Sequence, residues 1–150
     1  MIRLIDFEAA HAVELLEHYK HRFADWKFAD EAWFANMKRA ERSFSLIDNG
    51  NLIVSGGIVP IFEGLGEAWL VPSDKITDYK LRMIKTLRHH IDKITEEDGL
   101  RRLQAAVRAD FPEAVRFIEF MGFKREGLME AYGPDGSDYF LYARINKWSK

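Results

Sequence analysis

Apolar residues recur at helical spacing in several stretches of the chain. After a short apolar segment at residues 1–5, they return every three or four positions from Ala9 to Tyr19, which predicts a strand followed by a helix. Asp6 is placed to cap the start of this helix. A second, shorter helix is predicted over residues 30–41. The chain therefore opens with a strand and two helices.

The longest helical pattern lies in the second half of the chain and ends near Gly99, because glycine is common just beyond the end of a helix. Its apolar face consists of Ile76, Tyr79, Met83, Ile84, Leu87, Ile91 and Ile94. A further helix precedes the dipeptide at Gly122 and Phe123. Strand-like segments separate these two helices and follow the second one.

Short apolar runs between turn residues predict the strands. Residues 43–62 form two such runs joined by Asn49 and Gly50, a dipeptide typical of two-residue hairpin turns. Gly56 and Gly57, within the second run, indicate a bulge. Further strands are predicted at residues 66–71, 102–109, 125–132 and 138–145, and residues 133–137 have the composition of a turn. The order β-α-α-β-β-β-α-β-α-β-β predicts an α/β fold, a mixed sheet with helices on both faces.

Composition limits the classes of function. With 150 residues, 47% of them hydrophobic, the chain is expected to form one domain, residues 1–150, around one core. A formal charge of -2 provides no broad basic surface, so nucleic acid is not an expected partner. The absence of cysteine excludes disulfides, a thiolate nucleophile and sulfur-based zinc sites. Without a targeting segment or a membrane-spanning apolar run, a soluble cytoplasmic protein with no membrane partner is expected.

The stretch VRADFPEAVRFIEFMGFKREG, from Val107 to Gly127, contains a strand end, a loop, a helix and a Gly-Phe pair that leads into another strand. Together with the element order of nearly the whole chain, it resembles the GNAT superfamily of acetyl-CoA-dependent N-acetyltransferases. The resemblance implies direct transfer of an acetyl group from acetyl-CoA to a primary amine of a small molecule or a peptide. It also allows a second copy of the chain as a partner, in a homodimer.

The resemblance further implies where acetyl-CoA binds, which in this family is at the fourth strand and the start of the following helix. Backbone N–H groups around Trp69, Leu70 and Val71 are then expected at the thioester oxygen. Lys75 takes the basic position of the family's phosphate loop, and Lys80 follows near the helix start. These five residues are the candidate cofactor-binding residues.

Four positions depart from the family's pattern: Asp78, Lys80, Phe111 and Ile118. Asp78 and Lys80 stand where glycine lets phosphate approach the backbone, although Asp78 is equally suited to cap the helix. Phe111 and Ile118 replace a hydrogen-bonding Asn and Tyr, donate no hydrogen bond and are both expected in the core. With these departures and the stretch WLVPSD, from Trp69 to Asp74, the chain also resembles a smaller group of acetyltransferase-like phage proteins, including internal virion proteins. A catalytically silent structural or interaction protein is therefore the alternative to an enzyme.

Glu67, at the start of the fourth strand, is the candidate catalytic residue, because the family often places there a carboxylate that takes a proton from the substrate ammonium. A glutamate at a strand start is also often just exposed. In the family, the missing tyrosine commonly protonates the departing thiolate. The candidates to replace it are Tyr132, Tyr139 and Tyr142, near the last hairpin.

No metal site is expected. His89 and His90 are adjacent on a helix, so their side chains diverge. The other three histidines, which lie at approximately helical spacing, have no cluster of acidic residues nearby. They are His11, His18 and His21. The aromatic-rich residues 23–34 either line an acceptor pocket or pack in the core.

Overall fold

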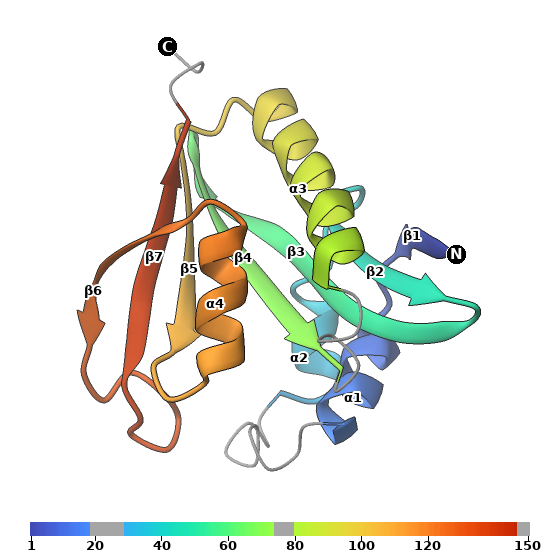
Figure 1. The fold of residues 1–150 in the computed structure, drawn as a ribbon, viewed down its shortest axis with the longest axis horizontal. Helices are drawn as coiled ribbons and strands as arrows, with labels where there is room; N and C mark the ends of the chain where they lie inside the picture. Colours follow the sequence, from blue (N-terminus) through green and yellow to red (C-terminus); the bar gives the residue numbers. More distant parts are fainter. Residues whose placement is uncertain (19–28, 74–79, 147–150) are drawn as a thin grey trace. The chain divides into compact units, whose positions relative to one another are not determined.

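The computed structural model describes residues 1–18, 29–73 and 80–146. In chain order the elements are β1 (Ile2–Asp6), α1 (Ala9–His18), α2 (Glu31–Ala35), β2 (Ser43–Asp48), β3 (Asn51–Phe62), β4 (Leu65–Pro72), α3 (Lys80–Glu97), β5 (Arg102–Arg108), α4 (Pro112–Phe120), β6 (Lys124–Met129) and β7 (Tyr139–Ile145). This is the element order predicted from the sequence, and it can be followed along the ribbon in Figure 1.

The strands belong to one sheet with the order β1-β2-β3-β4-β5-β7-β6. β4 and β5 run parallel, whereas the pairs β1–β2, β2–β3, β5–β7 and β6–β7 are antiparallel. The predicted mixed α/β fold is therefore confirmed. The chain divides into two compact units: the first unit is Met1–Val59 with Trp69–Met83, and the second unit is Pro60–Ala68 with Ile84–Lys150.

In the first unit, β2 and β3 are joined by the predicted tight turn at Asn49 and Gly50. Both residues have positive φ, 51° and 84°, as a two-residue hairpin of this type requires. Asp48 and Asn51, on either side of the turn, are paired across the two strands. These angles and this pairing confirm the predicted hairpin. The physical reason is that asparagine and glycine tolerate positive φ better than other residues.

The bulge between β2 and β3 is not at the two consecutive glycines. The pairing shifts between Leu46 and Ile47, whereas Gly56 and Gly57 pair regularly with β2. A Cβ atom on Gly56 would lie 2.8 Å from the carbonyl oxygen of Trp69, and one on Gly57 would lie 2.9 Å from its indole nitrogen. The bulge predicted at these glycines is therefore absent from the β2–β3 pairing, and the glycines allow Trp69 to approach the β3 backbone closely.

The first unit has an apolar core beneath its short helices. The buried cluster consists of Phe7, Ala12, Leu15, Ala29, Phe34 and Val71. Asp6 is the last residue of β1, so it does not cap α1 as predicted. The backbone N–H of Glu8 donates to His11 Nδ1 (3.1 Å), and the N–H of His11 donates to the Glu8 carbonyl (2.8 Å). His11 thus takes the part that Glu or Gln plays in a capping box.

In the second unit, alternate residues of β5 and one face of α3 are buried. On β5 the buried residues are Leu103, Ala105 and Val107, and on α3 they include Leu87, Ile91 and Ile94. Gly99 has a φ of 60° just after α3, which confirms the predicted helix end. Ile76 and Tyr79, from the predicted apolar face, lie outside the described residues.

Phe111, which precedes α4, is buried as predicted, with 4% of its surface exposed. Ile118 is only half-buried, and no residue of α4 is fully buried. The prediction that Ile118 is a core residue is therefore wrong. Helical periodicity shows which residues share a face, but not how completely the rest of the molecule covers that face.

Within the part of the chain that is described, no helix has the length and apolar character needed to span a membrane.

Candidate functional site

The parallel pairing of β4 with β5 brings Glu67 beside Gln104. The register joins Leu65 to Arg102, Gly66 to Leu103 and Glu67 to Gln104, and it ends there although both strands continue. Residues of a strand alternate between its two faces, so Gln104 lies on the face opposite the buried Leu103. Glu67 and Gln104 are both half-buried. Glu67 is therefore a partly accessible carboxylate held within a regular strand.

A chain of four polar side chains extends from Glu67 across this face of the second unit. Gln104 Nε2 donates to Glu67 Oε1 at 3.2 Å, and Arg102 Nε donates to Gln104 Oε1 at 3.0 Å. The Arg102 guanidinium then donates through both terminal nitrogens to the two carboxylate oxygens of Glu126, at 2.8 and 2.6 Å. This two-point pairing fixes the plane of the guanidinium as well as its position. We call Glu67, Gln104, Arg102 and Glu126 the β4–β6 polar chain.

The local structure of β6 and β7 explains how Arg102 reaches Glu126 across an intervening strand. The β6–β7 register shifts between Arg125 and Gly127, so Glu126 is the extra residue of a bulge. Ala143 of β7 is paired with Gln104 and therefore shares its face. Because alanine is small, the long Arg102 side chain can pass over β7. Sequence alternation alone does not reveal this arrangement, since a bulge changes the side to which a residue points.

Charge pairing within this polar chain affects the acid–base properties of its members. The hydrogen bonds to Glu126 raise the pKa of Arg102 against the opposing effect of burial. The same hydrogen bonds from Arg102 lower the pKa of Glu126. Burial, and then the nearby negative charge of Glu67, raise the pKa of Tyr132. Tyr132 therefore lies close enough to Glu67 to respond to its charge, and at neutral pH it keeps its phenolic proton.

The structure distinguishes the three tyrosines named from the sequence. Tyr142 is fully buried, and its hydroxyl is already bonded to Glu119 and Arg125. Tyr139 is 5% exposed, whereas Tyr132 is 52% exposed and its ring packs on that of Tyr139 at 5.3 Å between centroids. Of these three, only Tyr132 combines solvent access with an electrostatic response to Glu67.

Beyond Glu67, β4 continues into the first unit with the candidate backbone donors. Val71 is buried and Trp69 and Leu70 are half-buried. The Trp69 ring contacts Phe7 edge-on at 5.0 Å and lies 6.2 Å from the Phe34 ring. Phe34 is 2% exposed, so this member of the aromatic-rich segment packs in the core. Residues 23–28 of that segment lie outside the described residues.

The expected phosphate loop falls largely outside the described residues. Lys75 and Asp78 belong to residues 74–79, which the structure does not describe, and Lys80 is the first residue of α3. Phe111 occupies the position before α4 and makes no side-chain hydrogen bond to cap it. Phe111 and Ile118 thus provide no polar replacement for the family's Asn and Tyr.

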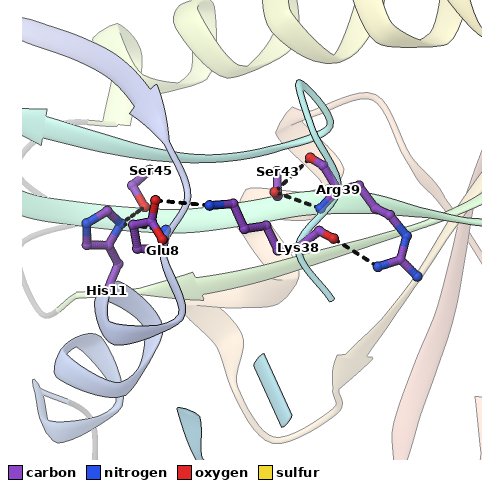
Figure 2. A network of polar contacts seen from close by, with 6 residues as sticks. All are labelled: Glu8, His11, Lys38, Arg39, Ser43 and Ser45. Atoms are coloured by element: carbon purple, nitrogen blue, oxygen red, sulfur yellow. Dashed lines mark hydrogen bonds and ion pairs between the residues drawn. The ribbon is translucent and has the colours of Figure 1, made fainter. Parts of the chain in front are cut away.

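A second cluster of hydrogen-bonded polar side chains lies in the first unit, around His11 (Figure 2). His11 Nδ1 is 2.8 Å from Ser45 Oγ, which is in turn 2.6 Å from Ser55 Oγ. A serine beside a histidine is the arrangement of many nucleophiles. However, Ser45 and Ser55 are both completely buried, and His11 Nδ1 also accepts the backbone N–H of Glu8. These contacts hold α1 against β2 and present no reactive oxygen to a substrate.

Within the described ranges, no group of three or more acidic, histidine or cysteine side chains is placed to hold a metal ion. Among the described functional candidates, sequence reasoning identified Glu67 but missed its partners. Gln104 and Arg102 lie at alternate positions of a predicted strand, which is a detectable signal, but their pairing with Glu67 depends on the strand register. Glu126 had no sequence signal because its position depends on the bulge.

No protein-family model matches the chain, and no curated protein sequence matches it. Solved structures do match over almost the whole chain. A ribosomal-protein alanine acetyltransferase from Vibrio fischeri has a TM-score of 0.74 at 16% identity, covering 99% of this chain and 95% of its own. An acetyltransferase of the GNAT family from Bacillus anthracis has a TM-score of 0.70 at 20% identity, covering 96% and 94%.

A spermidine N-acetyltransferase variant from Vibrio cholerae has a TM-score of 0.67 at 16% identity, covering 96% of this chain and 93% of its own. The structural neighbours are thus GNAT-family acetyltransferases. At these identities the similarity shows the fold, and function has to be argued from the side chains.

Proposed function

We propose that this protein is an N-acetyltransferase that moves an acetyl group from acetyl-CoA directly to a primary amine. The observation that carries the proposal is the placement of Glu67 on β4. Its carboxylate is half-buried and oriented by Gln104, at the last residue pair that joins β4 to β5. The structural neighbours named above support the same reaction, since their names describe acetylation of a protein alanine and of spermidine.

In the proposed reaction, Glu67 accepts a proton from the acceptor ammonium, so that the free amine can act as nucleophile. A carboxylate suits this step when it is fixed within hydrogen-bonding reach of the proton. The chain contains no cysteine to form an acyl-enzyme, so we propose a single direct transfer. Attack of the amine breaks the bond between the acetyl carbon and the CoA sulfur, and the sulfur leaves as a thiolate. Tyr132 is the candidate donor of a proton to this thiolate, because it is partly exposed and close enough to Glu67 for that charge to raise its pKa.

When bound, acetyl-CoA would supply an activated acetyl group. The backbone N–H groups of Trp69, Leu70 and Val71 are the proposed donors to the thioester oxygen, and they follow Glu67 on the same strand. The register of β4 with β5 includes none of these three residues, which is compatible with such a use of their backbone. Lys75 and Lys80 are the proposed contacts for the phosphates.

The alternative is a catalytically silent interaction protein with the same fold, of the acetyltransferase-like phage group. Four departures from the family's pattern favour it: Phe111 and Ile118 offer no hydrogen-bonding side chain, and Asp78 and Lys80 stand where glycine is expected. The two proposals differ in whether the protein binds acetyl-CoA and transfers its acetyl group.

Thermal unfolding with and without acetyl-CoA tests the first step. A ligand that binds the native state raises its stability, by about 2.7 kcal/mol at a free concentration 100 times the Kd. We expect stabilisation that weakens as salt increases, because exposed phosphate contacts are screened. An unchanged melting temperature at millimolar acetyl-CoA would favour the silent protein.

Glu67→Gln tests the chemical step. This change keeps the shape of the side chain and removes the base, so transfer to an amine should fall roughly 10²- to 10⁴-fold near neutral pH. Binding of acetyl-CoA should remain, and higher pH should restore part of the rate because more of the amine is already unprotonated. Glu63→Gln, at an exposed glutamate in the turn between β3 and β4, is the matched control. Full activity of Glu67→Gln would exclude Glu67 as the base.

A further inference from the structure

We propose that Gln104 is a positioning residue for Glu67, and that Arg102 holds the Gln104 amide in the single orientation that serves this purpose. The inference deepens the proposed acetyltransferase function and rests on it for its catalytic meaning. Its structural content, one fixed hydrogen bond to Glu67, stands on the contacts of the second unit alone.

The chemistry of the two neighbours determines the amide orientation. A glutamine amide has a donor end and an acceptor end that differ little in shape. Arginine has only donors, so the Gln104 oxygen must face Arg102. The Gln104 NH₂ group is then left to face Glu67, whose ionised carboxylate has only acceptors. Reversing the amide would place donor against donor and acceptor against acceptor at the same time.

Arg102 can impose this orientation because it is itself held in place. Its two terminal nitrogens bind both oxygens of Glu126, and its third nitrogen, Nε, donates to Gln104. Lysine carries the same charge but lacks the planar fork, so it cannot bind Glu126 at two points and also donate sideways to Gln104. Arg102→Lys therefore removes the contacts that orient the Gln104 amide while keeping the positive charge at position 102.

For catalysis, the consequence is a base whose free oxygen points in one direction. Gln104 occupies Glu67 Oε1, which leaves Oε2 as the oxygen for the acceptor ammonium. Catalytic groups lose much of their effect when they are displaced by about 1 Å, so a fixed carboxylate is worth more than a freely rotating one. Among the described residues of this unit, the charged or titratable side chains near Glu67 include Arg102, Glu126 and Tyr132.

The decisive experiment combines Gln104→Leu and Arg102→Lys with two measurements. The first is kcat and KM for acetyl transfer, determined separately. The second is the carbon-13 NMR signal of the Glu67 side-chain carboxyl near neutral pH, assigned by its disappearance in Glu67→Gln. This signal responds to the hydrogen bond that the carboxylate accepts from Gln104. Gln104→Leu should therefore move the carboxyl signal and lower kcat roughly tenfold with a smaller change in KM, because a base that is free to rotate is less effective.

Arg102→Lys should shift both readouts in the same direction by less, although the positive charge is kept. Lys93→Met is the matched control, because it removes an exposed cation of α3, a helix that lies on the opposite face of the sheet, where its Asp92 pairs with Arg144. An unchanged Glu67 carboxyl signal in Gln104→Leu overturns the inference, whatever the activity. A moved signal with unchanged kcat overturns the catalytic role. No transfer by the wild type refutes the acetyltransferase proposal instead, while the NMR signal still decides whether Gln104 holds Glu67.

Discussion

Replacing Tyr142 by phenylalanine should weaken the fold without removing the chemistry. The Tyr142 side chain is completely buried on β7. Its hydroxyl donates to Glu119 Oε2 at 2.6 Å and accepts from Arg125 Nε and Nη2, each at 3.1 Å. These contacts join α4, β6 and β7 through one oxygen atom. Tyr142→Phe removes that oxygen and leaves the packed ring in place.

The expected magnitude follows from how exposed the two partners are. A hydrogen bond to a charged group contributes about 1.5–3 kcal/mol. However, the side chains of Glu119 and Arg125 are 50% and 46% exposed, and their charged groups remain 3.7 Å apart. Water and this ion pair can recover part of the lost interaction, so we expect a net loss of about 1–2 kcal/mol in the free energy of unfolding. This corresponds to a fall of roughly 2–8 °C in Tm for a chain of this size.

Urea unfolding measures the loss, and its pH dependence provides a second signature. Burial and the Glu119 bond raise the pKa of Tyr142, with Arg125 opposing them. The native state therefore favours the protonated phenol, and this contribution is complete below the ordinary tyrosine pKa of about 10. It is lost as pH rises through the higher native value. The difference in stability between the wild type and Tyr142→Phe should accordingly narrow at strongly alkaline pH.

Two results would refute this reasoning. Equal stability of wild type and Tyr142→Phe at neutral pH would mean that the hydroxyl contributes nothing to the fold. A large loss of acetyl transfer with unchanged stability would mean that Tyr142, and not Tyr132, is the proton donor. A double-mutant cycle with Glu119→Gln separates the Tyr142–Glu119 contact from the rest, with a coupling expected at about 1 kcal/mol.

Three further outcomes are expected. Tyr132→Phe should lower acetyl transfer roughly 10²-fold and leave stability within about 0.5 kcal/mol, because Tyr132 is 52% exposed; activity assays and urea unfolding check this. Gly57→Ala should lower the free energy of unfolding in urea by about 1–3 kcal/mol, because its Cβ would lie 2.9 Å from a backbone oxygen. Gly127→Ala should be tolerated, because no atom lies within 4 Å of the added Cβ. Hydrogen bonds from Ser137 and then Arg108 lower the pKa of Asp135 from 3.8 to about 2. Asp135→Asn should therefore lower the free energy of unfolding at neutral pH. The difference in stability between the wild type and this variant should disappear as pH falls from about 4 to about 2.

Local patterns in the sequence were sufficient for the elements and their order. The helical repeat leading to Gly99, and the turn at Asn49 and Gly50, depend on the residues themselves, because periodicity and tolerance of positive φ are local properties. The element order was enough to indicate the fold that the solved neighbours share. Glu67 became a candidate through the resemblance to the GNAT superfamily, which often has a carboxylate at the start of the fourth strand, and not from a local pattern.

Only the tertiary structure decided what Glu67 contacts and how fully Ile118 is covered. Gln104 meets Glu67 because β4 and β5 pair in one register out of several possible ones. Glu126 reaches Arg102 because β6 contains a bulge, and Gly56 is a glycine because Trp69 passes close to it, not because the strand bulges there. Contacts of this kind join residues far apart in the chain. Their geometry depends on strand register and packing, to which no local pattern of apolar and polar residues is sensitive.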